Sequence, residues 1–120
     1  MTAEEVAKKI VQVFDSKKAS KVTLLKTTDV TIIADYFILA TGNSNTQVRA
    51  LSGEVEFQMK ELGIEADHME GFESGTWILM DFHDVIVHIF QPETRNFYDL
   101  ERLWKDAQPV DISELVDPNE

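Results

Sequence analysis

One short segment contains side chains that could bind a metal ion or transfer a proton. Asp81, His83 and Asp84 lie close together in the sequence, and His88 follows on the next predicted strand. Two carboxylates and an imidazole could hold a divalent cation. However, Asp is also a common capping residue of tight turns, and no distant third ligand stands out. We therefore interpret Asp81 and Asp84 as turn residues and predict no metal site.

A second candidate is the turn 42–44, which lies between a predicted strand and a predicted helix. Backbone amides at such a position could bind a phosphate group. The glycines of a dinucleotide fingerprint and the lysine of a P-loop are missing, and no nucleophile elbow is present. Ser44 is explained more simply as the N-cap of the helix. We predict no catalytic residue and no cofactor.

An aromatic strand face is the more informative feature. Alternation along the strand places Ile78 and Met80 on the core face. The opposite face carries Trp77, Leu79 and Asp81, an apolar pair beside a carboxylate. This face is either a binding patch that borders water or a second buried face beneath a helix. The pattern alone leaves both interpretations open.

The last predicted helix raises the same question. Phe97, Leu100 and Trp104 recur at helical spacing, and we expect this stripe to be buried. Tyr98 and Glu101 lie on the neighbouring face and should be more exposed. Trp, Tyr and Arg are the residues most often found as interface hot spots.

Hydrophobic periodicity predicts the elements that position these side chains. Capping boxes at Thr2 and Ser44 begin two long helices, and Gly63 ends the second of them. The short link at residues 83–84 predicts an antiparallel hairpin. The predicted strands cover residues 20–26, 36–40, 64–69, 76–82 and 85–90. We predict a single-domain α/β protein with a mixed five-stranded sheet and helices packed on it.

Composition limits the function classes. The 120 residues include 22 acidic and 11 basic side chains, a net charge of −11, and no cysteine. Disulfides and thiolate chemistry are excluded, and free nucleic acid is a poor partner for so acidic a chain. No apolar run is long enough to cross a membrane, so we expect a cytoplasmic protein. We predict a domain over 1–106 and an acidic, flexible tail over 107–120.

Several motifs follow one another along the chain, and they are Asp35-Tyr-Phe-Ile-Leu-Ala-Thr-Gly-Asn-Ser44, Glu70-Gly71, Trp77-Ile-Leu-Met-Asp81, Asp84-Val-Ile-Val-His-Ile-Phe90 and Arg95-x-Phe-Tyr-x-Leu-Glu-x-Leu-Trp104. In this order the motifs resemble the Iojap family of ribosomal silencing factors. The resemblance extends from the first helix to Trp104. One departure is His83, where the family usually carries glycine.

The resemblance implies a nucleotidyltransferase-like fold without the catalytic equipment. It also implies a translation repressor that binds the large ribosomal subunit through its fourteenth protein and blocks joining of the small subunit when nutrients are scarce. The resemblance to some family members further implies a role in assembly of the large ribosomal subunit. The partner-binding residues that we predict are Trp77, Leu79, Asp81, Arg95, Tyr98 and Glu101.

Two alternatives remain at this point. The first is a metal-dependent nucleotidyltransferase-like enzyme that uses Asp81 and Asp84, with the turn 42–44 holding phosphate. The second is a homodimer in which the apolar patch is a self-interface, and such a dimer could also form off the ribosome.

Overall fold

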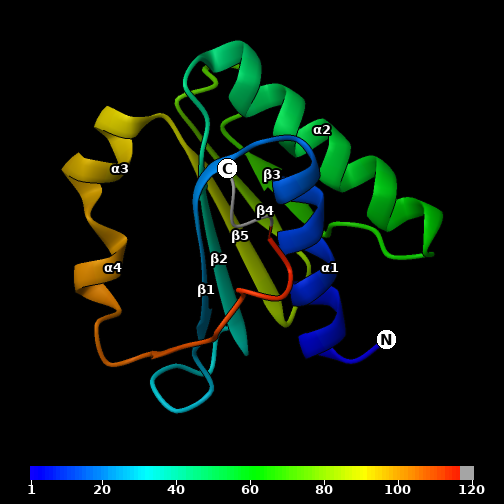
Figure 1. The fold of residues 1–120 in the computed structure, drawn as a ribbon, viewed down its shortest axis with the longest axis vertical. Coiled ribbons are helices and arrows are strands. Elements are labelled where there is room, and N and C mark those ends of the chain that lie inside the picture. Colours follow the sequence, from blue (N-terminus) through cyan, green and yellow to red (C-terminus); the bar gives the residue numbers. More distant parts are fainter. Residues whose placement is uncertain (117–120) are drawn as a thin grey trace.

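The computed structural model describes residues 1–116 and has helices on both faces of a mixed β-sheet (Figure 1). Two long helices lie on one side of the strands, and two short helices lie on the other. None of the helices in the described chain is long and apolar enough to span a membrane. In chain order the elements are α1 (Ala3–Ser16), β1 (Ser20–Lys26), β2 (Tyr36–Thr41), α2 (Asn45–Glu61), β3 (His68–Glu70), β4 (Trp77–Asp81), β5 (Val85–Phe90), α3 (Pro92–Tyr98), α4 (Leu100–Leu103) and β6 (Gln108–Pro109).

The strands pair in the order β3-β4-β5-β2-β1-β6. Among these strands of the described chain, β2 and β5 run parallel and every other neighbouring pair is antiparallel. The predicted hairpin is confirmed as β4 and β5. The mixed α/β sheet is also confirmed, but within residues 1–116 it has six strands instead of five, because β6 pairs with Leu25 and Lys26 at the edge. The two residues of β6 are too few for an alternating pattern, so sequence reasoning missed this strand.

The main core lies between the sheet and the two long helices. β2 and β5, the central strands, are buried along their whole length. β4 alternates, with Ile78 and Met80 fully buried, so the predicted core face of this strand is confirmed. α1 and α2 bury Val6, Ile10, Phe14, Val48, Leu51, Val55 and Met59 in the same cluster.

The capping of the two long helices agrees with the sequence-based prediction in most details. The Thr2 hydroxyl accepts from the Glu5 amide, and the Glu5 carboxylate accepts from the Thr2 amide, which completes the predicted capping box. The Ser44 hydroxyl caps α2 by accepting from the Gln47 amide. The reciprocal bond of the second box differs from the prediction, because the Gln47 side chain accepts from the Asn43 amide at 2.6 Å.

The segment after α4 packs against the sheet in its described part. Ala107 is buried, β6 pairs with β1, and the chain then crosses to the α1 side of the molecule (Figure 1). There Val110, Ile112 and Leu115 pack against the main core. The flexibility that we expected from residue 107 onward stays a prediction beside these contacts. Residues 117–120 lie outside the described chain, and the boundary at residue 106 stays a prediction.

Candidate partner-binding site

Trp77 lies on the sheet face opposite α1 and α2, at the centre of an aromatic cluster. Its ring stacks on Phe90 with centroids 5.1 Å apart, and its centroid lies 4.7 Å from that of Tyr98 in α3. The indole Nε1 donates a hydrogen bond to Nδ1 of His88 at 3.1 Å. The side chain is half-buried. Trp77 therefore falls between our two interpretations, since one part of the ring packs inside the protein and the rest is accessible.

His88 is part of the floor of this cluster. The side chain is 5% exposed, and burial lowers the pKa of its imidazole to about 4. The ring is therefore neutral at physiological pH, which leaves Nδ1 free to accept from Trp77. From the sequence we considered His88 only as a possible metal ligand or proton-transfer group. Its present role follows from the hairpin register, which pairs Leu79 with His88 and Trp77 with Phe90.

We use the name aromatic patch for Trp77, Leu79, Phe90 and Tyr98. Among them, Tyr98 is the most accessible, with 52% of its surface exposed, and Leu79 is half-buried. Phe90 is fully buried and supports the other rings from below. Phe90 was not among the predicted site residues, because a phenylalanine in a continuously apolar strand looks like ordinary core.

Asp81 lies at the end of β4, on the same face and half-buried. One of its carboxylate oxygens accepts from the His83 amide at 2.8 Å, which is the turn role that we inferred. His83 has a left-handed backbone with φ of 72°, a conformation that favours glycine. Its Nε2 lies 2.7 Å from a carboxylate oxygen of Asp67. Within residues 1–116, no three His, Asp or Glu side chains gather as a metal site.

The closing segment corrects one prediction. Phe97 is 80% exposed, whereas we expected it in a buried stripe with Leu100 and Trp104. The reason is a break at Asp99, whose left-handed backbone separates α3 from α4. The residues therefore do not share one continuous helix. Leu100 and Trp104 do pack against the second core cluster, as expected.

Arg95 is also placed differently from our prediction. We expected its side chain on the contact surface, but the residue is 6% exposed and its guanidinium bonds groups inside the protein. Glu101, which is exposed, accepts from Nε of Arg95 at 2.9 Å. The structure thus brings Trp77, Leu79 and Tyr98 together, with Glu101 bound to Arg95.

The turn 42–44 has a structural explanation as well. Ser44 caps α2, and a Cβ atom at Gly42 would lie 3.0 Å from a methyl group of Val48. Gly42 therefore permits close packing of the helix start on the strand end.

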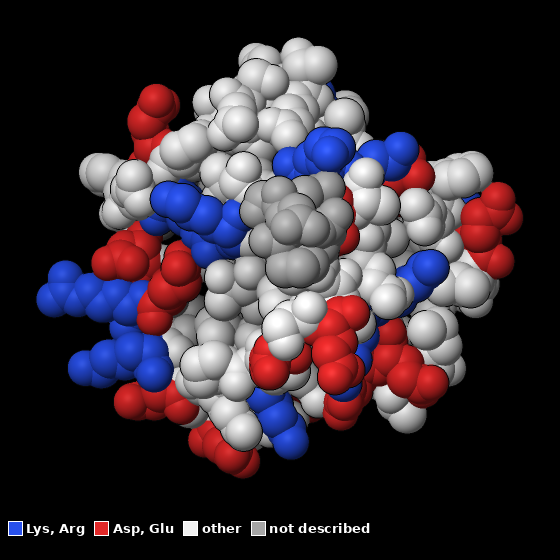
Figure 2. All heavy atoms as spheres, in the orientation of Figure 1, with Lys and Arg blue, Asp and Glu red and all other residues white. Residues whose placement is uncertain are grey.

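The surface charge is mixed on the face that Figure 2 shows. Acidic side chains are spread over this view, with Lys and Arg between them. The net charge of −11 therefore does not come from one continuous acidic face in this view. At long range the charge still favours a basic partner over nucleic acid.

Fold and site together define a class of protein: a small domain with a mixed sheet and a partly exposed aromatic patch. A family model described as "Ribosomal silencing factor during starvation" matches residues 1–120. The chain is 38% identical over 116 residues to "Ribosomal silencing factor RsfS" of Halalkalibacterium halodurans, covering 97% of this chain and 99% of that protein. A crystal structure of a Chromobacterium violaceum protein superposes with a TM-score of 0.85 at 38% identity, covering 88% of each chain.

The chain belongs to the family of ribosomal silencing factors. The resemblance noted from its motifs is thereby confirmed. A more distant relative from Mus musculus is called "Mitochondrial assembly of ribosomal large subunit protein 1". It is 33% identical over 73 residues, which cover 58% of this chain and 32% of that protein.

Proposed function

We propose that this chain is a cytoplasmic translation repressor that binds the large ribosomal subunit through its fourteenth protein. Bound there, it blocks joining of the small subunit by occupying the surface that the small subunit needs. It also contributes to assembly of the large subunit, a role in keeping with the name of the mouse relative. No chemical step is involved, so we propose a binding protein and not an enzyme.

The aromatic patch is the observation that carries this proposal. Trp77 and Tyr98 lie in ring contact on the sheet face that α1 and α2 leave uncovered, and both have accessible surface. Aromatic rings held in place by their neighbours are typical anchors of protein interfaces, because little conformational entropy is lost on binding. Leu79, Asp81 and Glu101 extend the proposed contact around these rings.

The test is cosedimentation of variants with purified large subunits. We expect Tyr98→Ala to lower the affinity about thirtyfold, the usual cost of removing a central interface aromatic. Trp77→Ala should abolish binding and lower the free energy of unfolding by about 2 kcal/mol, less than for a fully buried ring. Thermal melting of each variant separates lost binding from lost folding.

A matched control is available on the other side of the sheet. Phe57 on α2 is 59% exposed, so Phe57→Ala removes an aromatic ring of similar exposure from a different surface. This variant should bind as the wild type does. If folded Trp77→Ala and Tyr98→Ala proteins still sediment with large subunits, the proposed site is wrong.

The enzyme alternative predicts a different result. A nucleotidyltransferase-like activity would show turnover of ATP with a divalent cation, and Asp81→Asn would abolish it. We expect no turnover, because the Asp81 carboxylate accepts a hydrogen bond from the His83 amide in the turn, and no three His, Asp or Glu side chains of residues 1–116 gather as a metal site. A homodimer whose self-interface is the patch would instead be seen by sedimentation of the chain alone, and Tyr98→Ala would then dissociate it.

A further inference from the structure

We propose that Arg95 is a positioning residue that fixes α3 and α4 over the sheet and thereby holds Tyr98 against Trp77. The inference deepens the proposed function and rests on it for its binding readout. It gives Arg95 a role different from the direct contact predicted from the sequence.

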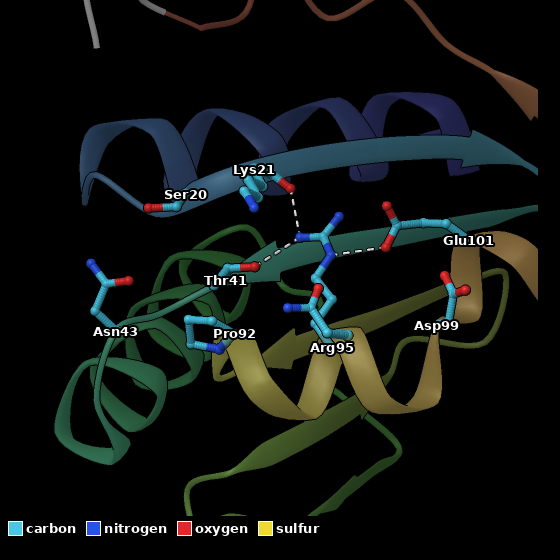
Figure 3. Close-up of a pocket in the computed structure, with 9 residues that line it drawn as sticks. Ser20, Lys21, Thr41, Asn43, Pro92, Arg95, Asp99 and Glu101 are labelled. Carbon is cyan, nitrogen blue, oxygen red and sulfur yellow. Dashed lines mark hydrogen bonds and ion pairs between the residues drawn. The ribbon is translucent and has the colours of Figure 1, made fainter.

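Arg95 connects its helix to three other elements. Nη1 donates to the Thr41 hydroxyl in β2 at 2.9 Å and to the Lys21 carbonyl in β1 at 2.7 Å (Figure 3). Nη2 donates to the Thr23 hydroxyl in β1 at 3.2 Å. Nε donates to Glu101 in α4 at 2.9 Å. A buried guanidinium with this many partners is held in a single geometry.

Apolar burial would otherwise hold this segment only weakly. Arg95 is the buried residue of α3, and α4 has none. Phe97 and Leu103 point into solvent, with 80% and 68% of their surface exposed. The remaining apolar contacts come from the half-buried Leu100 and Trp104 and from the ring contact of Tyr98 with Trp77. The hydrogen bonds of Arg95 are therefore a principal connection between α3 and the strands.

Two strained residues lie at this connection. Lys21, whose carbonyl accepts from Arg95, and Asp99, whose amide donates to the Arg95 carbonyl, both have φ of 49°. Left-handed backbone is unfavourable for residues other than glycine and persists where the surroundings enforce it. Lys21 also lies where the register between β1 and β2 shifts, so this irregularity turns its carbonyl toward Arg95.

A cavity of about 320 Å³ adjoins the guanidinium, and its wall includes Ser20, Asn43, Pro92 and Asn96 (Figure 3). The donors of Arg95 already bond groups of the protein itself. The Arg95 side chain therefore connects the elements that line the cavity, in keeping with a positioning role.

Thr41 allows a test without touching the contact surface, because it is 3% exposed and cannot reach a partner. Thr41→Val keeps the shape and removes the acceptor, whereas Thr41→Ser keeps the acceptor. We expect Thr41→Val to lower the affinity for large subunits about tenfold, because a charged donor loses its partner, and Thr41→Ser to bind nearly as the wild type does. In NMR spectra, the indole N–H resonance of Trp77 should shift in Thr41→Val and not in Thr41→Ser.

A double-mutant cycle with Tyr98→Ala decides whether the effect passes through Tyr98. We expect Thr41→Val to change the affinity less than about twofold once Tyr98 is Ala, because no ring remains to be positioned. Additive losses, or an unshifted Trp77 resonance, would overturn the inference. If Thr41→Val does not fold, Thr23→Val removes the acceptor of Arg95 Nη2 instead. This variant is then tested by the same double-mutant cycle and by the shift of the Trp77 resonance.

Failure of the proposed function gives a different result. If the wild-type chain does not sediment with large subunits, the proposed partner is wrong. The Trp77 resonance then tests the positioning role of Arg95 without a binding measurement. It should shift in Thr41→Val and stay at its wild-type position in Thr41→Ser.

Discussion

The indole of Trp77 depends on a neutral histidine beneath it. His88 accepts from the indole N–H at Nδ1, which requires that nitrogen to be unprotonated. Burial lowers the pKa of His88 from 6.5 to about 4, because the imidazolium would lose its hydration inside the protein. The same residue therefore couples the proposed contact site to pH.

We expect acid to destabilise the protein through His88. The unfolded chain binds a proton near pH 6.5 and the folded chain near pH 4, so stability falls as the pH drops through this window. The full effect, reached below pH 4, is about 3 kcal/mol. Urea unfolding of wild type and His88→Gln at several pH values measures it, since glutamine offers an acceptor that does not titrate. Equal pH dependence of the two proteins would contradict the prediction.

At the scale of elements, the loop 71–76 sets the start of β4. Arg49 in α2 donates from Nε to the Phe72 carbonyl at 2.9 Å, and its guanidinium also bonds the Glu73 carbonyl. Gly71 has φ of 84°, and a Cβ atom there would lie 1.9 Å from the Trp77 carbonyl oxygen. The loop is thus packed directly on the backbone of the strand that carries Trp77.

Two glycine substitutions should change the free energy of unfolding in opposite directions. Gly71→Ala should lower the free energy of unfolding by at least about 3 kcal/mol, because the overlap with the backbone adds to the left-handed strain. Gly53→Ala in α2 is the control, since a Cβ atom there meets nothing within 4 Å. It should stabilise the protein by about 1 kcal/mol through helix propensity. Urea unfolding tests both, and a Gly71→Ala protein as stable as wild type would contradict the close approach.

For the whole molecule, charge matters more for the rate of association than for the fold. The net charge of −11 attracts a basic partner, and the range of this attraction becomes shorter as the salt concentration rises. The large subunit also contains RNA, which repels this chain. The isolated fourteenth protein, which is the partner that we propose, is therefore the cleaner ligand for measuring the attraction.

We expect the association rate with that isolated protein to fall tenfold or more between about 0.05 M and about 0.5 M salt, because added ions screen the attraction. Stopped-flow fluorescence measures this rate. Tyr98→Ala should raise the dissociation rate and leave the salt dependence unchanged, since the lost ring carries no charge. An association rate that does not vary with salt would contradict electrostatic steering.

Local patterns in the sequence determined most of the secondary structure. The Thr2 capping box, the alternation around Ile78 and Met80, and the short link between β4 and β5 each depend on neighbouring residues, so they could be predicted. The ending of α2 is a further case: the Ile64 amide donates to the Met59 carbonyl, and Gly63 has φ of 78°. The same locality identified Trp77, Leu79 and Asp81 as one strand face.

Tertiary structure alone decided how the site is assembled. Strand register brings the buried Phe90 into the aromatic patch and places the buried His88 beneath Trp77. Arg95 is held inside the protein by acceptors from strands more than 50 residues away in sequence. Phe97 is exposed because a left-handed residue, Asp99, interrupts the helix that its spacing predicted. Such features arise from long-range contacts and from single backbone conformations, and neither leaves a periodic pattern in the sequence.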